Sequence, residues 1–90
     1  MRRNGKAMAN EIKHPYVVEV AVAGDALDLE LSRQIIQFHK SRHIQPRYGR
    51  RTKTRRGQFY YRWCFSDLST ARSFADGFDG AFCKPSVVSE

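Results

Sequence analysis

The chain has 90 residues, of which 41% are hydrophobic and 28% charged, and its formal net charge at pH 7 is +7. A chain of this length forms at most one domain with a small core. Its longest apolar stretch, residues 16–24, is interrupted by Glu19 and is shorter than the roughly 20 residues that span a bilayer, so we expect no membrane partner.

Residues 1–14 are polar and basic and show no periodicity, which predicts a flexible N-terminal tail. No apolar region follows the first basic residues, so a secretory signal is not expected. Cys64 and Cys83 are too few for a disulfide framework, and we expect a reducing, cytoplasmic setting. The remaining sequence predicts one domain over residues 15–84 and a C-terminal tail over residues 85–90.

Residues 16–23 are rich in valine and end at Gly24-Asp25, which predicts a strand. The segment from about residue 25 to residue 43 fits two structures. Alternation over residues 26–31 predicts a hairpin, with a helix beginning after Ser32. One long helix is favoured instead, because leucine and glutamate are better helix formers and four apolar residues recur at helical spacing. These four are Leu27, Leu31, Ile35 and Phe38.

Residues 45–57 contain Pro46, Gly49 and Gly57, which predicts a mobile loop, with Arg47-Tyr48 and Thr52 as candidates for a short edge strand. Residues 58–66 alternate in a way that puts four aromatic side chains on one face of a strand. Asp67 or Ser66 can cap a second helix that ends near Gly80, and residues 81–84 can form a last short strand.

Strands that alternate with helices indicate an α+β fold, a small two-layer α/β sandwich in which the helices cover one face of the sheet. The expected order is strand, helix, basic loop with an edge strand, strand, helix, strand.

The stretch from Gly57 to Gly80 also resembles the second half of an RNA-recognition motif. A glycine precedes an aromatic strand that ends in phenylalanine, and acidic, small and apolar residues follow at the family's spacing. These residues are Phe65, Asp67, Ala71, Phe74, Ala75, Phe78, Asp79 and Gly80. The resemblance implies a ferredoxin-like arrangement and RNA binding. In that family two positions of the strand carry base-stacking aromatics; here they are Tyr60 and Arg62, and Phe59 stands where the family has glycine.

The net positive charge is concentrated in one segment. Between Arg42 and Arg56 there are seven basic residues and no acidic residue, and the rest of the chain has equal numbers of both. Such a segment attracts polyanions, and arginine grips phosphate bidentately. We expect a non-catalytic domain that binds nucleic acid, or another polyanion, non-specifically. The candidate binding residues are Arg42, Arg47, Arg50, Arg51, Lys53, Arg55 and Arg56, with Tyr60 and Arg62 as secondary candidates for base contact and Lys40 flanking.

Three other kinds of function, a protein-interaction module, a metal site and an enzyme, have less support in the sequence. The segment can be a solvated charge run in a protein-interaction or homo-oligomerisation module with no nucleic-acid role. A zinc site would need His39, His43, Cys64 and Cys83 to converge, and the spacings of zinc fingers are absent, so no metal is expected. His39 and His43 are interpreted instead as ordinary residues at a partly exposed helix end. No catalytic motif is present, and neither a cofactor nor a small-molecule ligand is predicted.

Overall fold

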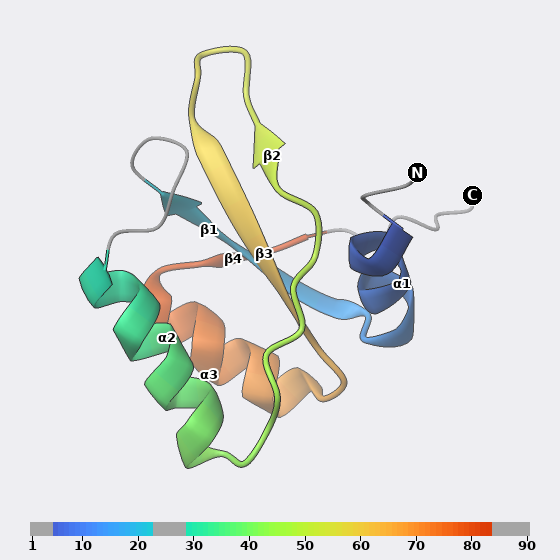
Figure 1. The fold of residues 1–90 in the computed structure, drawn as a ribbon, viewed down its shortest axis with the longest axis vertical. Helices are drawn as coiled ribbons and strands as arrows, with labels where there is room; N and C mark the ends of the chain where they lie inside the picture. Colours follow the sequence, from blue (N-terminus) through green and yellow to red (C-terminus); the bar gives the residue numbers. More distant parts are fainter. Residues whose placement is uncertain (1–4, 23–28, 84–90) are drawn as a thin grey trace.

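A computed structural model describes residues 5–22 and 29–83 (Figure 1). The elements within these residues are α1 (Gly5–Lys13), β1 (Tyr16–Val22), α2 (Leu29–Ser41), β2 (Thr52–Lys53), β3 (Phe59–Phe65), α3 (Leu68–Phe78) and β4 (Ala81–Phe82). The strands form one antiparallel sheet in the order β2-β3-β1-β4. Both crossovers, through α2 and through α3, skip one strand, as in the split β-α-β ferredoxin-like arrangement. The predicted α+β sandwich is confirmed.

The register of β1 and β3 sorts their side chains onto two faces of the sheet. Val18 lies opposite Trp63, and both are fully buried on the face that α2 and α3 cover. Phe74 of α3 is also fully buried, with its ring centroid 5.5 Å from that of Trp63. This core forms as predicted because period-2 and period-3.6 stripes of apolar residues meet face to face.

The predicted second helix is confirmed, with Asp67 as its N-cap. The Thr70 amide donates to the Asp67 carboxylate at 2.8 Å, which satisfies one of the backbone donors left unpaired at a helix start. At the other end Asp79 adopts a left-handed conformation (φ +56°) and its amide donates to the Ala75 carbonyl. The chain therefore turns sharply into β4.

Helix α2 begins at Leu29, so the hairpin alternative is wrong for residues 29–31; residues 25–28 lie outside the described residues. The helix ends in two hydrogen bonds, from the His43 amide to the Lys40 carbonyl and from the Ile44 amide to the His39 carbonyl. This is the pattern of a Schellman C-cap, and His43 holds the left-handed position (φ +56°) that glycine usually occupies.

The predicted N-terminal tail is wrong for residues 5–13, which form α1 and pack beside the sheet on the face away from α2 and α3 (Figure 1). Polar contacts dock this helix. Asn10 donates from its side-chain amide to the Tyr48 carbonyl at 2.9 Å, and Glu11 is buried against two arginines. Apolar periodicity cannot reveal a helix that docks through polar groups. No helix among the described residues is long and apolar enough to cross a membrane.

Candidate nucleic-acid interface

The basic segment runs as an extended chain along the edge of β3. The Cys64 amide donates to the Arg47 carbonyl at 2.8 Å, and the Gly49 amide donates to the Arg62 carbonyl at 2.9 Å. Further along, Thr52 of β2 pairs with Tyr60 of β3. These bonds confirm the predicted edge strand. The segment forms it because β3 would otherwise leave a row of backbone donors and acceptors without partners.

The β2–β3 turn is closed by three hydrogen bonds between Thr54 and the two residues that end the loop. The Thr54 amide donates to the Gln58 carbonyl at 2.9 Å, and the Gly57 amide donates to the Thr54 carbonyl at 3.0 Å. The Gln58 amide also donates to Thr54 Oγ1 at 3.1 Å. Gly57 takes the left-handed φ of +90° that a three-residue hairpin loop requires. Arg55 and Arg56 are therefore held, exposed, at the apex.

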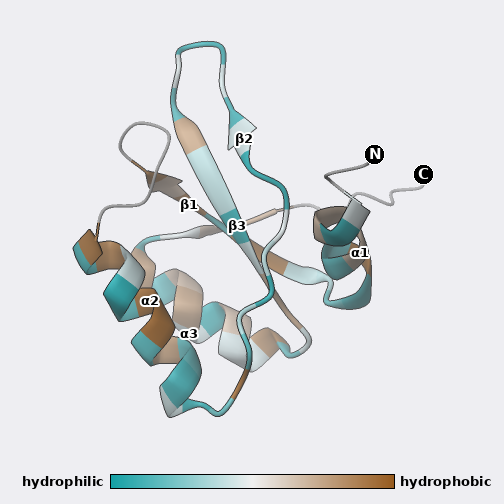
Figure 2. Ribbon diagram, viewed as in Figure 1, coloured by the Kyte–Doolittle hydropathy of each residue, from teal (hydrophilic) through white to brown (hydrophobic). Residues whose placement is uncertain are grey.

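The hairpin formed by residues 50–62 extends beyond α2 and α3 at one end of the molecule (Figure 1). Its tip and its β2 arm are mostly hydrophilic (Figure 2). On the arm, Arg51 and Lys53 are exposed and lie over aromatic rings, 5.6 Å from the ring centroid of Tyr61 and 5.0 Å from that of Phe59. We call these four exposed cations the hairpin cluster: Arg51, Lys53, Arg55 and Arg56.

Two predicted binding residues are instead committed to an internal ion pair. Arg50 Nη2 lies 2.9 Å from Glu11 Oε1, and the Arg50 amide donates to Glu11 Oε2 at 2.7 Å. Arg62 Nη1 lies 3.2 Å from the same carboxylate, and Arg62 Nε lies 3.8 Å from Glu19. The Glu11 side chain is only 5% exposed. We call Glu11, Arg50 and Arg62 the Glu11 clamp; it fastens α1 to the basic segment.

The clamp keeps Glu11 ionised. Burial alone would raise the pKa of Glu11, but hydrogen bonds from Arg50 and the charges of Arg62 and Arg50 outweigh it, and the pKa is lowered. Gly49 makes this approach sterically feasible, because a Cβ there would lie 2.8 Å from Glu11 Oε2 and 3.0 Å from the Arg62 Cβ.

The other candidates lie elsewhere. Arg42 stacks on Phe38, 4.1 Å from the ring centroid, at the end of α2 opposite to the hairpin tip (Figure 1). Arg47 is half-buried beside a cleft near that same end. Tyr60 is half-buried and lines an open depression with the hairpin tip. The nine candidates thus do not form one surface, and the hairpin cluster is their largest exposed group.

The histidines and cysteines do not converge. His39 is 1% exposed and stacks on Phe65 in the core, so its interpretation as a partly exposed residue is wrong. Cys64 lies on the opposite face of the sheet, where burial raises the pKa of its thiol to about 12. Within residues 5–22 and 29–83 no group of three or more histidine, cysteine or acidic side chains is placed to hold a metal ion.

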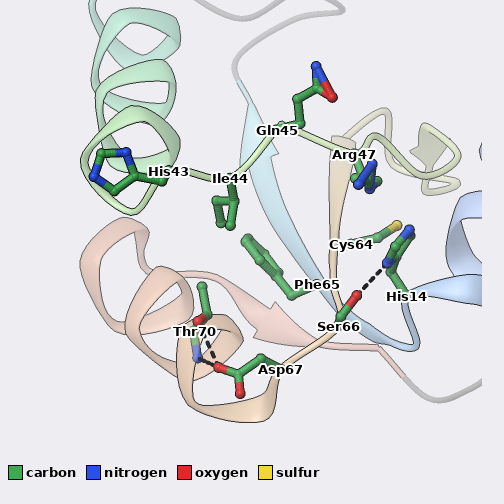
Figure 3. Close-up of a pocket in the computed structure, with 10 residues that line it drawn as sticks. All are labelled: His14, His43, Ile44, Gln45, Arg47, Cys64, Phe65, Ser66, Asp67 and Thr70. Atoms are coloured by element: carbon green, nitrogen blue, oxygen red, sulfur yellow. Dashed lines mark hydrogen bonds between the residues drawn. The ribbon is translucent and has the colours of Figure 1, made fainter.

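Besides the depression at the hairpin tip, the structure contains a cleft that the sequence does not predict. It is a cleft of about 250 Å³ between the end of α2 and the start of α3, with Ile44 and Phe65 as apolar wall (Figure 3). His14 Nδ1 and Ser66 Oγ are hydrogen-bonded at its rim, and Arg47 lies beside them. Burial and the charges of Arg47 and Lys13 lower the pKa of His14. The pair joins residues 52 positions apart in sequence, so no local motif could have indicated it.

The Ser66 hydroxyl and the His14 imidazole form a hydrogen-bonded pair. Asp67 also lines the cleft, but its carboxylate accepts hydrogen bonds from the Thr70 amide and hydroxyl as the cap of α3. No carboxylate of the described residues bonds the His14 ring to orient it, as a third group does in hydrolase triads. What this bond does accomplish is to tie the end of α1 to the end of β3.

Comparisons with protein-family models, with curated proteins and with solved structures found no match to this chain.

Proposed function

We propose that this protein binds nucleic acid, without catalysis and largely through phosphate contacts, and that the hairpin cluster carries the affinity. The observation that supports this most directly is the exposure of four cations on one ordered, protruding hairpin. No acidic residue occurs from residue 31 to residue 66, so none on the hairpin neutralises them. Nucleic acid is a polyanion whose phosphates such cations neutralise, with release of counterions. A cytoplasmic location remains a prediction.

The proposal revises the set of binding residues. Arg50 and Arg62 already share a carboxylate, so phosphate would have to compete with Glu11 for them. Arg42 and Arg47 lie toward the other end of the molecule and become secondary contacts. Tyr60 lines the depression at the hairpin tip and stays a candidate for contact with a base.

Salt dependence of binding tests the proposal. If the four cations each neutralise one phosphate, the slope of log affinity against log salt is about −3.6 on duplex DNA. Replacing Arg51, Lys53, Arg55 and Arg56 together by alanine should remove most of this slope. The measurement is fluorescence anisotropy with labelled oligonucleotides between about 50 and 200 mM salt, where phosphate-driven affinity changes steeply.

A matched control removes the same net charge elsewhere. The four exposed residues Lys6, Lys13, Arg33 and Arg72 are replaced by alanine, and this variant should retain most of the affinity. Equal losses in both variants would show that net charge alone attracts the ligand. No binding by the native protein at low salt would refute the proposal and leave homo-oligomerisation, detectable as a concentration-dependent mass, as the alternative.

A further inference from the structure

Cations lie over two aromatic rings of the hairpin on which single-stranded bases would stack, whereas Tyr48, which precedes the hairpin, is 52% exposed. Proteins that bind single strands offer exposed aromatic rings to successive bases. On the hairpin, the Arg51 guanidinium lies over the Tyr61 ring, and the Lys53 ammonium lies over the Phe59 ring. A base that stacked on the same face of either ring would compete with the cation there.

Part of the sheet face away from α2 and α3 is obstructed as well. In the RNA-recognition arrangement that the sequence resembles, stacking positions on β3 face the ligand. Here the second of those positions is Arg62, whose side chain is 19% exposed and is paired with Glu11 and Glu19. The first, Tyr60, is half-buried. Helix α1 packs against this face at Arg62 through Glu11, so it restricts the access of an RNA strand to that part of the face.

The part of the molecule that stays accessible is a two-stranded ribbon. The hairpin projects from the body of the protein with its apex formed by Arg55 and Arg56 (Figure 1). Hydrogen bonds of Thr54 to Gly57 and Gln58 close the loop that carries the apex. Gln58 also donates from its side chain to the Val22 carbonyl at 2.8 Å, which ties the base of the loop to β1.

The shape and charge of this ribbon select among nucleic acids. The major groove of B-form DNA is about 12 Å wide and admits a two-stranded β-ribbon. The major groove of A-form RNA is deep and too narrow for side chains to read. We infer, building on the proposed function, that the ligand is duplex DNA and that the hairpin apex enters its major groove. Arg55 and Arg56 then lie inside the groove, and Arg51 and Lys53 contact the phosphates of its wall.

The test compares three ligands of one sequence, each about 20 nucleotides or base pairs long, roughly two turns of B-DNA. They are duplex DNA, the single DNA strand and duplex RNA. We expect duplex DNA to bind at least about tenfold more tightly than the other two. Binding should also protect guanine N7, which lies in the major groove, from methylation by dimethyl sulfate.

Variants locate the groove contact. Arg55→Ala with Arg56→Ala should abolish the protection of guanine N7, whereas Arg33→Ala with Arg72→Ala should leave it intact. Single strands or duplex RNA bound as tightly as duplex DNA, or duplex DNA bound without N7 protection, would overturn this inference while leaving the proposed function standing. Failure of all three ligands to bind would instead overturn the proposed function itself.

Discussion

Arg50 and Arg51 are adjacent in sequence and identical in chemistry, yet they lie in opposite surroundings. Arg50 turns toward α1 and shares the buried carboxylate of Glu11 with Arg62. Arg51 turns the other way, over the ring of Tyr61, with its charge in solvent. The difference arises because successive side chains of an extended chain point to opposite faces. Residues 50–56 therefore hold two kinds of cation: Arg50, which is paired with a buried carboxylate, and the four exposed cations of the hairpin cluster.

The Glu11 clamp holds α1 against the rest of the protein, whereas the cations of the hairpin cluster are exposed to solvent. Breaking a buried ion pair leaves an uncompensated charge inside the protein, which is strongly destabilising. Exposed cations contribute little to stability, so removing them should leave folding nearly unchanged.

The largest effect on stability is expected from Glu11→Ala. Without the carboxylate, Arg50 loses its ion pair, Arg62 keeps only Glu19 at 3.8 Å, and α1 loses its charged contact with the segment. We expect the free energy of unfolding to fall by about 3 kcal/mol, at the lower end for buried pairs because both arginines keep some contact with water. Denaturation by urea measures it. The matched control is Glu30→Ala, which removes an exposed carboxylate 3.8 Å from Arg33 and should cost less than about 0.5 kcal/mol. Similar losses in both variants would contradict the clamp.

The second prediction concerns the space beside the carboxylate. Gly49→Ala places a methyl group 2.8 Å from Glu11 Oε2, so the clamp must open or the segment must move away from β3. We expect a loss of about 2 kcal/mol, within the range for overpacked sites. Gly77→Ala serves as the control, because no atom lies within 4 Å of a Cβ there and alanine suits a helix better. That variant should be more stable than the native protein, by up to about 1 kcal/mol. If Gly49→Ala does not lower the free energy of unfolding, the Glu11 clamp has room for a methyl group and its close packing at Gly49 is contradicted.

The third prediction is a pH dependence in two windows. Burial lowers the pKa of His39, although the Ile35 carbonyl works to raise it, and the pKa of His14 is also lowered. Below about pH 6.5 these histidines bind protons more readily in the unfolded chain than in the folded protein. The free energy of unfolding therefore falls as pH falls. Each group contributes at most about 1.4 kcal/mol per pH unit.

In the second window, at lower pH, the stability depends on the ionisation of carboxylates. Since the pKa of Glu11 is lowered, its stabilising contribution is complete above its ordinary value of 4.5 and is lost as pH falls through the folded-state pKa. Asp67, whose pKa is lowered by its hydrogen bonds to Thr70, contributes in the same window. Thermal unfolding from pH 8 to pH 3 should therefore show a shallower decline below pH 4.5 in Glu11→Gln than in the native protein. An unchanged profile would mean that Glu11 is not held ionised by the arginines.

The smallest effect on stability is expected where the effect on binding is largest. Alanine at all four positions of the hairpin cluster should change the free energy of unfolding by less than about 1 kcal/mol, because each cation is exposed. The urea midpoint and slope should match those of the native protein. A clear loss of stability would show that Arg51 and Lys53, through their contacts with Tyr61 and Phe59, hold the hairpin together and are not free for a ligand.

Much of the fold could be predicted from the chain alone. The aromatic stripe of β3, the valines of β1 and the cap at Asp67 are local patterns, and each led to the element that the structure contains. The concentration of positive charge is equally local. What these patterns share is that neighbours in sequence carry the whole signal, since secondary-structure periods span only a few residues.

The sorting of the cations was decided by tertiary structure. Glu11 and Arg50 are 39 residues apart, and Glu11 and Arg62 are 51 apart, so nothing near Glu11 indicates that a polar helix will dock there. Likewise, the loop residues became a hairpin arm only because β3 offered an unpaired edge. The sequence by itself determined how much positive charge the segment carries. The pairing of distant strands and the arrival of α1 on one face decided which charges are neutralised and which remain exposed, because an ion pair depends on distance in space and not along the chain.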